Sequence, residues 1–226
     1  MIHGTVYLLF AAELAWVMSA SPVILAPLGY PIISFLVAGL GFLSGQPAVF
    51  GKKPDGHFQT PLFLLHLPFH GMGWLAAGLR KLRDTHHPYD EIVPGLWLGE
   101  RTQNLPEGVE LLVDLTAEHS RIDVSVNDYL LIATLDGQAP DLDALAHAIK
   151  EIESSPRCTY VHCWAGKGRS ATLVAGLLIA KGLAKNADDA EQYLQARRPI
   201  VKLSKSQHDV VNQYAMRSRN DVVAPD

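Results

Sequence analysis

The stretch from Val161 to Ser170, VHCWAGKGRS, decides the fold of this chain. It begins inside a short apolar run, CTYVHC at 158–163, and a run of this kind bounded by turn residues is typical of a strand. Directly after it, SATLVAGLLIAKG at 170–182 is apolar nearly all round and stops at Gly182, which predicts a buried helix with a glycine C-terminal signal. The quoted stretch is therefore the turn at which a strand gives way to a helix.

The residues of this turn suit an anion-binding loop. Backbone N–H groups at a strand-to-helix turn point toward one position, and the helix N-terminus adds a positive partial charge. Gly166 and Gly168 permit backbone conformations that other residues resist, so the loop can close around a phosphoryl group. The planar guanidinium of Arg169 can hold two phosphoryl oxygens at once. We therefore expect phosphate to be bound by Trp164, Ala165, Gly166, Lys167, Gly168 and Arg169.

Cys163 is expected at the bottom of this loop. A free thiol has a pKa of about 8.5, and a helix N-terminus with nearby cations lowers it. The resulting thiolate can attack phosphorus and form a phosphocysteine intermediate. Loop amides and Arg169 would stabilise the charge on the phosphoryl oxygens. Ser170 can donate a hydrogen bond to the sulfur and help it leave in the second step.

A general acid is needed to protonate the leaving oxygen, and Asp136 in TLDGQAP is the candidate. It follows the apolar run 128–135 and precedes an amphipathic helix predicted over 141–153, so it lies in a loop that can face the cysteine. The alternative is that Asp136 only makes a turn with Gly137. No metal or other cofactor is expected, because a nucleophile and an acid suffice.

The rest of the region 88–218 alternates strands with helices. This alternation predicts an α/β domain with a mainly parallel central sheet and helices on both faces. Asn186 is the expected N-cap of the helix predicted at 186–199. The further strands are expected at 95–101, 110–116 and 128–135, and the further helices at 141–153, 186–199 and 204–217.

The motif HCWAGKGRS resembles the signature loop of the cysteine-based protein tyrosine phosphatases, His-Cys-x5-Arg-Ser/Thr. An acid loop, a helix and then strand–Cys–Arg–helix, in that order, are similar to the dual-specificity branch. PGLWLGE and RRPIVKLSKSQ also resemble that branch. The resemblance implies that Cys163 is the nucleophile, Arg169 the phosphate ligand and Asp136 the acid, and that His162 tunes the thiolate by hydrogen bonding. Trp164 departs from the small or basic residue often found after the cysteine.

The first 51 residues contain no Lys or Arg, and Glu13 is their one acid. Two apolar runs, 1–20 and 22–43, each have the length that crosses a hydrocarbon core. We therefore expect a two-helix transmembrane hairpin at 1–44. The alternatives are a cleaved signal peptide followed by one span, and helices that lie in the bilayer interface or are buried.

Basic residues that follow the second run place the phosphatase domain in the cytoplasm. The protein is then expected to be a multi-pass membrane protein. Residues 45–87 are predicted to be a linker whose segment 61–83 either lies in the bilayer interface or packs on the domain. Residues 219–226 are expected to form a flexible tail. The net charge of −4 favours no nucleic-acid partner.

Three functions fit these residues. The first is a dual-specificity protein phosphatase acting on phosphotyrosine, phosphoserine and phosphothreonine. The second is a phosphatase of a membrane phospholipid headgroup, either phosphatidylglycerophosphate or a phosphoinositide, with Lys167 binding the extra charge. The third is a catalytically dead phosphate-binding module, which the presence of nucleophile, arginine and acid together disfavours.

Overall fold

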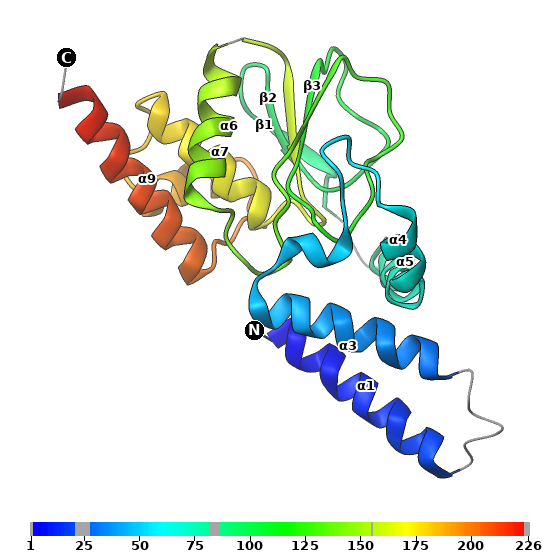
Figure 1. Ribbon diagram of the computed structural model, residues 1–226. Coiled ribbons are helices and arrows are strands. Elements are labelled where there is room, and N and C mark those ends of the chain that lie inside the picture. The colour runs from blue at the N-terminus through cyan, green and yellow to red at the C-terminus, as the bar shows by residue number, and fades with distance from the viewer. Residues whose placement is uncertain (1, 21–27, 82–85, 155, 224–226) are drawn as a thin grey trace. The chain divides into compact units, whose positions relative to one another are not determined.

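The computed structural model describes residues 2–20, 28–81, 86–154 and 156–223 (Figure 1). The chain divides into two compact units. The first comprises residues 1–86 with the short segment 117–120, and the second comprises residues 87–116 with 121–226.

In the first unit, helices α1 (Ile2–Ala20) and α3 (Gly29–Ser44) run side by side (Figure 1). Glycine lets the two backbones approach closely, since a Cβ at Gly4 would lie 3.0 Å from the carbonyl oxygen of Gly39. Rings of the two helices also pack edge to face, with 4.9 Å between the centroids of Phe10 and Phe35. The chain continues through the 3₁₀ helix η2 (Pro47–Phe50) and the helices α4 (Thr60–Leu65) and α5 (Leu67–Lys81).

The paired helices form where the sequence predicts them, but the predicted transmembrane hairpin is not supported. Among the residues that the structure describes, no helix is both long and apolar enough to cross a membrane. The second apolar run began at Pro22, whereas α3 begins at Gly29, and residues 21–27 lie outside the described part of the chain. With 16 residues, α3 has a length of about 24 Å, below the roughly 30 Å of a hydrocarbon core.

The second unit contains a five-stranded sheet in the order β1-β2-β5-β3-β4. The pair β1–β2 is antiparallel, and the other neighbours are parallel. The four strands that the sequence predicts are confirmed. The sheet consists of β1 (Tyr89–Val93), β2 (Leu96–Gly99), β3 (Leu111–Asp114), β4 (Asp128–Leu131) and β5 (Thr159–His162).

The register of the sheet places Cys163 and its loop at the carboxyl ends of three strands. His162, the last residue of β5, pairs with Gly99 on one side and with Asp114 on the other. Three neighbouring parallel strands therefore end at the same level, and Cys163 is the first residue beyond that edge. In open α/β sheets, ligands bind outside the carboxyl ends of the strands.

The helices of this unit are α6 (Leu142–Ser154), α7 (Arg169–Ala180), α8 (Ala187–Gln195) and α9 (Lys205–Val223). The helix predicted at 170–182 is confirmed as the buried α7, and it is followed by Gly182 with φ +70°. The final helix is longer than predicted. Because α9 reaches Val223, the expected tail is helical as far as that residue.

The predicted placement of helices on both faces is wrong for the described residues of this unit. Side chains of α6 to α9 join one cluster with the sheet residues Val113 and Val161. The neighbouring strand residues Leu112 and Tyr160 point to the opposite face. There they pack with Ile122, Leu105 and other loop residues rather than with a helix of this unit. Loops that connect short strands thus cover the second face.

The N-cap of α8 gives a direct test of local stability. Asn186 accepts a hydrogen bond from the Asp189 N–H at 2.9 Å. We expect Asn186→Ala to lower the free energy of unfolding by about 1 kcal/mol, measured by urea unfolding followed by circular dichroism. Asn186→Asp retains an acceptor oxygen and serves as the control. An alanine variant as stable as the parent would show that this cap is not needed.

Candidate active site

The motif lines a cavity of about 380 Å³ in the second unit. The sequence-predicted residues Cys163, Arg169 and Asp136 meet there, although Asp136 is far from the other two in the chain. Residues that follow α8 form another side of the cavity, and no motif in the sequence indicated them. The lining residues are Asp136, Gly137, Cys163, Trp164, Ala165, Lys167, Gly168, Arg169, Lys202, Leu203, Ser204 and Gln207.

Cys163 is a buried free thiol at the end of β5. The hydroxyl of Ser170 donates a hydrogen bond to its Sγ at 3.2 Å. Burial by itself raises the pKa of the Cys163 thiol. The Arg169 guanidinium and hydrogen bonds from Ser170 and the Ala165 backbone lower this pKa by more, so that it falls below its ordinary value. The other cysteine, Cys158, is also free and precedes the opposite end of β5.

Arg169 is the first residue of α7, and its side chain is only 1% exposed. One guanidinium nitrogen, Nη1, donates to the carbonyl oxygen of Thr134 at 2.8 Å. The other, Nη2, lies 3.1 Å from Oδ1 of Asp136, whose side chain is 46% exposed. The guanidinium therefore faces the cavity with a carboxylate as its partner, and an incoming phosphoryl group must compete with Asp136 for it.

Gly166 has φ +66°, a left-handed conformation that favours glycine. A Cβ at this position would also lie 2.5 Å from the carbonyl carbon of Gly99. Gly168 has φ −119°, so the prediction of an unusual conformation is wrong there. Its constraint is a close neighbour instead, because a Cβ would lie 2.9 Å from Oε1 of Gln207.

Arg198 supports the loop from below and was not identified from the sequence. Its side chain is 1% exposed, and its Nε donates to the carbonyl oxygen of Gly166 at 2.9 Å. Its Nη1 donates to Oδ2 of Asp90 in β1 at 2.7 Å. A buried arginine paired with a carboxylate thus connects the loop to the edge strand. The one signal in the sequence was the arginine pair in RRPIVKLSKSQ.

His162 is fully buried beneath the loop. Its Nδ1 lies 3.3 Å from the carbonyl oxygen of Cys163, and its Nε2 lies 3.9 Å from Oδ2 of Asp114. Asp114 in turn accepts hydrogen bonds from Thr116 and from the hydroxyl of Tyr129. The described contact of His162 with the nucleophile therefore passes through the backbone of Cys163.

Gln207 connects the acid loop to the start of α9. Its side chain is 3% exposed, and its Nε2 donates to the carbonyl oxygen of Gln138 at 2.9 Å. Its Oε1 accepts from the N–H of Ser204 at 2.9 Å. Because Gln138 lies two residues after Asp136, this amide fixes the backbone near the candidate acid. Nothing in the spacing of the sequence indicates this contact.

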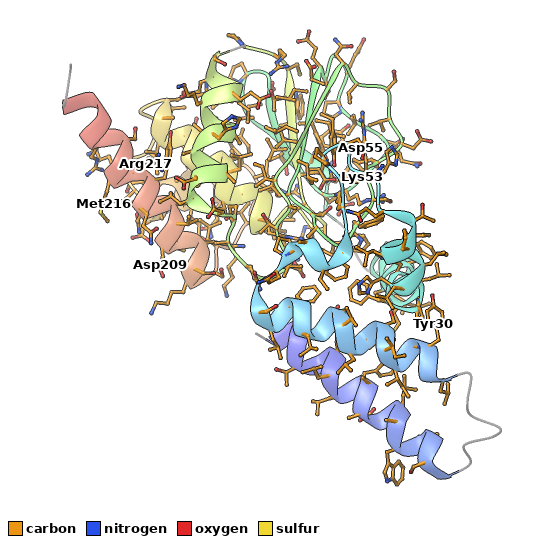
Figure 2. The ribbon with its side chains drawn as sticks, in the orientation of Figure 1. Tyr30, Lys53, Asp55, Asp209, Met216 and Arg217 are labelled. Carbon is orange, nitrogen blue, oxygen red and sulfur yellow. The ribbon has the colours of Figure 1, made fainter. Side chains whose placement is uncertain are left out.

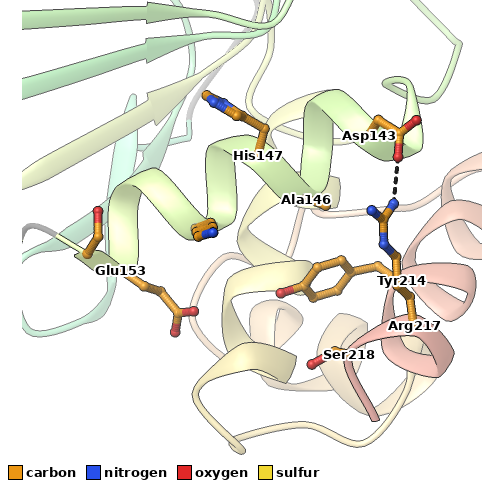
Figure 3. Close-up of a pocket in the computed structure, with 9 residues that line it drawn as sticks. Asp143, Ala146, His147, Glu153, Tyr214, Arg217 and Ser218 are labelled. Atoms are coloured by element: carbon orange, nitrogen blue, oxygen red, sulfur yellow. Dashed lines mark hydrogen bonds and ion pairs between the residues drawn. The ribbon is translucent and has the colours of Figure 1, made fainter. Parts of the chain in front are cut away.

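A larger cavity, of about 750 Å³, lies between α6 and α9 (Figure 3). Arg217 of α9, labelled in Figure 2, donates to Asp143 of α6 across its mouth at 2.5 Å. Its lining includes His147 and Tyr214 but none of the residues of the cysteine loop. The smaller cavity, which contains the acidified thiol and the buried arginine, is the candidate active site.

An acidified thiol directly beneath an anion-binding loop is the arrangement of the cysteine-based phosphatases, and the central sheet agrees with that class. A family model described as the dual specificity phosphatase catalytic domain matches residues 102–217, just over half of the chain. The chain therefore belongs to this family and carries a phosphatase catalytic domain. Among the described residues, no group of three His, Cys, Asp or Glu side chains could hold a metal ion.

The sequence is also similar to that of a characterised phosphatase. Phosphatidylglycerophosphate phosphatase PTPMT1 of Arabidopsis thaliana is 39% identical over 92 residues, which are 38% of this chain and 27% of that protein. The chain thus matches only about a quarter of the length of this relative.

Two solved structures share the fold. The crystal structure of PTPMT1 in complex with PI(5)P has a TM-score of 0.54 at 20% identity and covers 60% of this chain and 99% of that one. Human DUSP28 has a TM-score of 0.50 at 21% identity, with 60% and 97% covered.

The surroundings of Cys163 predict its titration. In a Cys158→Ser background, we expect the rate of iodoacetamide alkylation to rise with pH around a midpoint below the ordinary thiol value of about 8.5. Because Ser170 stabilises the thiolate, Ser170→Ala is expected to move the midpoint upward. The urea-unfolded protein provides the reference. A native midpoint at or above that of the unfolded protein would refute an acidified thiol.

Proposed function

We propose that this protein hydrolyses the phosphomonoester of a membrane phospholipid headgroup. The observation that carries the proposal is the 39% identity to a phosphatidylglycerophosphate phosphatase. This identity favours a phospholipid substrate over the phosphoproteins on which dual-specificity phosphatases were expected to act. The cations that line the cavity, Lys167, Lys202 and Arg169, support an anionic headgroup as substrate.

The first step is a transfer of the phosphoryl group to the protein. The Cys163 thiolate attacks phosphorus, a sulfur–phosphorus bond forms, and the bond from phosphorus to the alcohol oxygen breaks. Arg169 exchanges its contact with Asp136 for two phosphoryl oxygens, and the loop amides bind the remaining charge. Asp136, released from the guanidinium and protonated, donates its proton to the departing alcohol.

The second step frees the enzyme. A water molecule attacks the phosphocysteine, and Asp136, now a carboxylate, takes a proton from that water. The sulfur–phosphorus bond breaks, inorganic phosphate departs, and the sulfur leaves as a thiolate. The hydroxyl of Ser170, 3.2 Å from Sγ, stabilises the thiolate as it forms. No oxidant, metal or other cofactor enters this balance.

The first unit supports an association with lipid. Large apolar side chains are exposed on all three of its longer helices, including Trp16 (78%) of α1, Leu40 (53%) of α3, and Trp74 (60%) and Leu75 (64%) of α5. Figure 2 shows this unit with its side chains, with Tyr30 labelled near the start of α3. Exposed apolar helix faces that carry tryptophan are typical of segments lying in a bilayer interface. We propose interfacial association in place of the predicted spans.

A comparison of substrates tests the proposed function. We expect the full chain to release phosphate from phosphatidylglycerophosphate or a phosphoinositide in vesicles with a kcat/KM at least tenfold above that for phosphotyrosine peptides. Cys163→Ser is the control, and its activity should be absent. Robust hydrolysis of phosphotyrosine peptides without any hydrolysis of lipid would instead support the protein-phosphatase hypothesis. Equal p-nitrophenyl phosphate turnover by parent and Cys163→Ser would instead indicate a catalytically dead module.

The role of Asp136 has a separate test. We expect Asp136→Asn to lower kcat by about 10²- to 10⁴-fold on a phospholipid, whose alkoxide leaving group needs a proton. The loss should be much smaller for p-nitrophenyl phosphate, because p-nitrophenolate leaves without one. Asp141→Asn is the matched control, since Asp141 caps α6 by accepting from the Asp143 and Ala144 N–H groups. Equal losses on both substrates would exclude Asp136 as the acid.

A further inference from the structure

Two lysines of the active-site cavity take no part in the two bond-making steps described above. Lys167 belongs to the cysteine loop, and Lys202 belongs to the segment between α8 and α9. Both side chains are exposed, in contrast to Arg169 at the base of the cavity. Neither lysine is paired with a carboxylate in the part of the chain that the structure describes. Two cations are therefore available at the mouth of the cavity.

The position of Lys202 is fixed by its backbone. Its N–H donates to the carbonyl oxygen of Lys167 at 3.1 Å, which joins the two lysine segments directly. Its neighbours Val201 and Leu203 are 2% and 6% exposed and belong to the core. The Leu203 N–H also donates to Oε1 of Glu191 at 2.8 Å. With the residues on both sides buried, the side chain of Lys202 projects outward beside the cavity.

The residues that line the cavity carry an excess of positive charge, which can balance a second anion. The residues that line it include one carboxylate, Asp136, against three cations, Arg169, Lys167 and Lys202. A bound phosphoryl group occupies Arg169 and the loop amides at the base. The two ammonium groups at the mouth then face an additional negative charge on the same molecule, and a lysine to phosphate contact is a charge-assisted hydrogen bond.

We propose that Lys202, together with Lys167, forms a second anion subsite. This subsite selects substrates that carry a second phosphate near the phosphomonoester that is cleaved. The inference rests on the proposed function and assigns residues to the second phosphate of its substrate: the cleavable monoester lies at the base, and the other phosphate, monoester or diester, lies at the mouth beside the two lysines. A lipid headgroup and a soluble bisphosphate share this chemistry, so the test separates the two sources.

The first measurement uses binding and does not depend on turnover. With the Cys163→Ser variant, calorimetry compares deacylated phosphatidylglycerophosphate, which has a phosphomonoester and a phosphodiester, with glycerol 3-phosphate, which has the monoester alone. We expect the first ligand to bind more tightly. Adding Lys202→Ala should reduce the ratio of the two affinities about tenfold, and Lys202→Arg should largely retain it.

Lys205→Ala is the matched control, because Lys205 is exposed at the start of α9 and does not line the cavity. The ratio should be unaffected by this change, and it should decrease with added salt. An unchanged ratio in Lys202→Ala, an equal loss in Lys205→Ala, or no preference for the doubly charged ligand would each overturn the subsite.

Vesicle assays distinguish this inference from the proposed function. If the deacylated headgroup is preferred through Lys202 but the intact lipid in vesicles is not hydrolysed, the lipid function fails and the subsite stands. The opposite result is that the lipid is hydrolysed but Lys202→Ala does not change the preference, measured as kcat/KM for this lipid divided by kcat/KM for a singly phosphorylated lipid. The subsite then fails and the lipid function stands.

Discussion

The active site depends on one electrostatic compensation: the Arg169 guanidinium lowers the pKa of the buried Cys163 thiol and so favours its thiolate. Both groups are almost completely buried, and a buried charge is costly unless a partner of opposite sign compensates it. Cys163 directly follows the strand β5 and Arg169 begins the helix α7, so a loop of only five residues, 164–168, brings the two groups together. The thiolate is thus stabilised at the point where the helix begins. The same turn therefore determines where Cys163 lies relative to the sheet and how reactive its thiol is.

Distant parts of the chain stabilise this turn through their own polar contacts. Arg198 joins the carbonyl oxygen of Gly166 to Asp90 of the edge strand β1, and Gln207 joins the acid loop to the start of α9. Each is a buried polar side chain with its partners in place, which is the condition under which such groups add rigidity instead of cost. The active-site loops are thus held by two buried side chains, and their partners come from segments far apart in the sequence.

Local patterns predicted much of this structure, and long-range contacts explain what they missed. The strand, glycine loop and apolar helix at 158–182 are recognisable because each depends on neighbouring residues. The strand β1 was missed because its sequence, YDEIV, holds two acidic residues, one of which is the partner of Arg198. Lys202 and Gln207 reach the cavity only through the packing of α8 and α9. The hairpin was expected to span a membrane because of the length of its two apolar runs, whereas the described helix α3 begins at Gly29 and has 16 residues.

The separation of the two cysteines by β5 has a consequence for redox chemistry. Thiolates of lowered pKa are readily oxidised to sulfenic acids, and many are rescued by condensing with a second cysteine. Cys158 lies five residues before Cys163 in extended chain, a separation of about 17 Å. A disulfide requires Cα atoms within about 7 Å, and β5 is hydrogen-bonded on both sides, which prevents it from folding back. With two cysteines in the chain, an oxidised Cys163 would have to be restored by an external thiol.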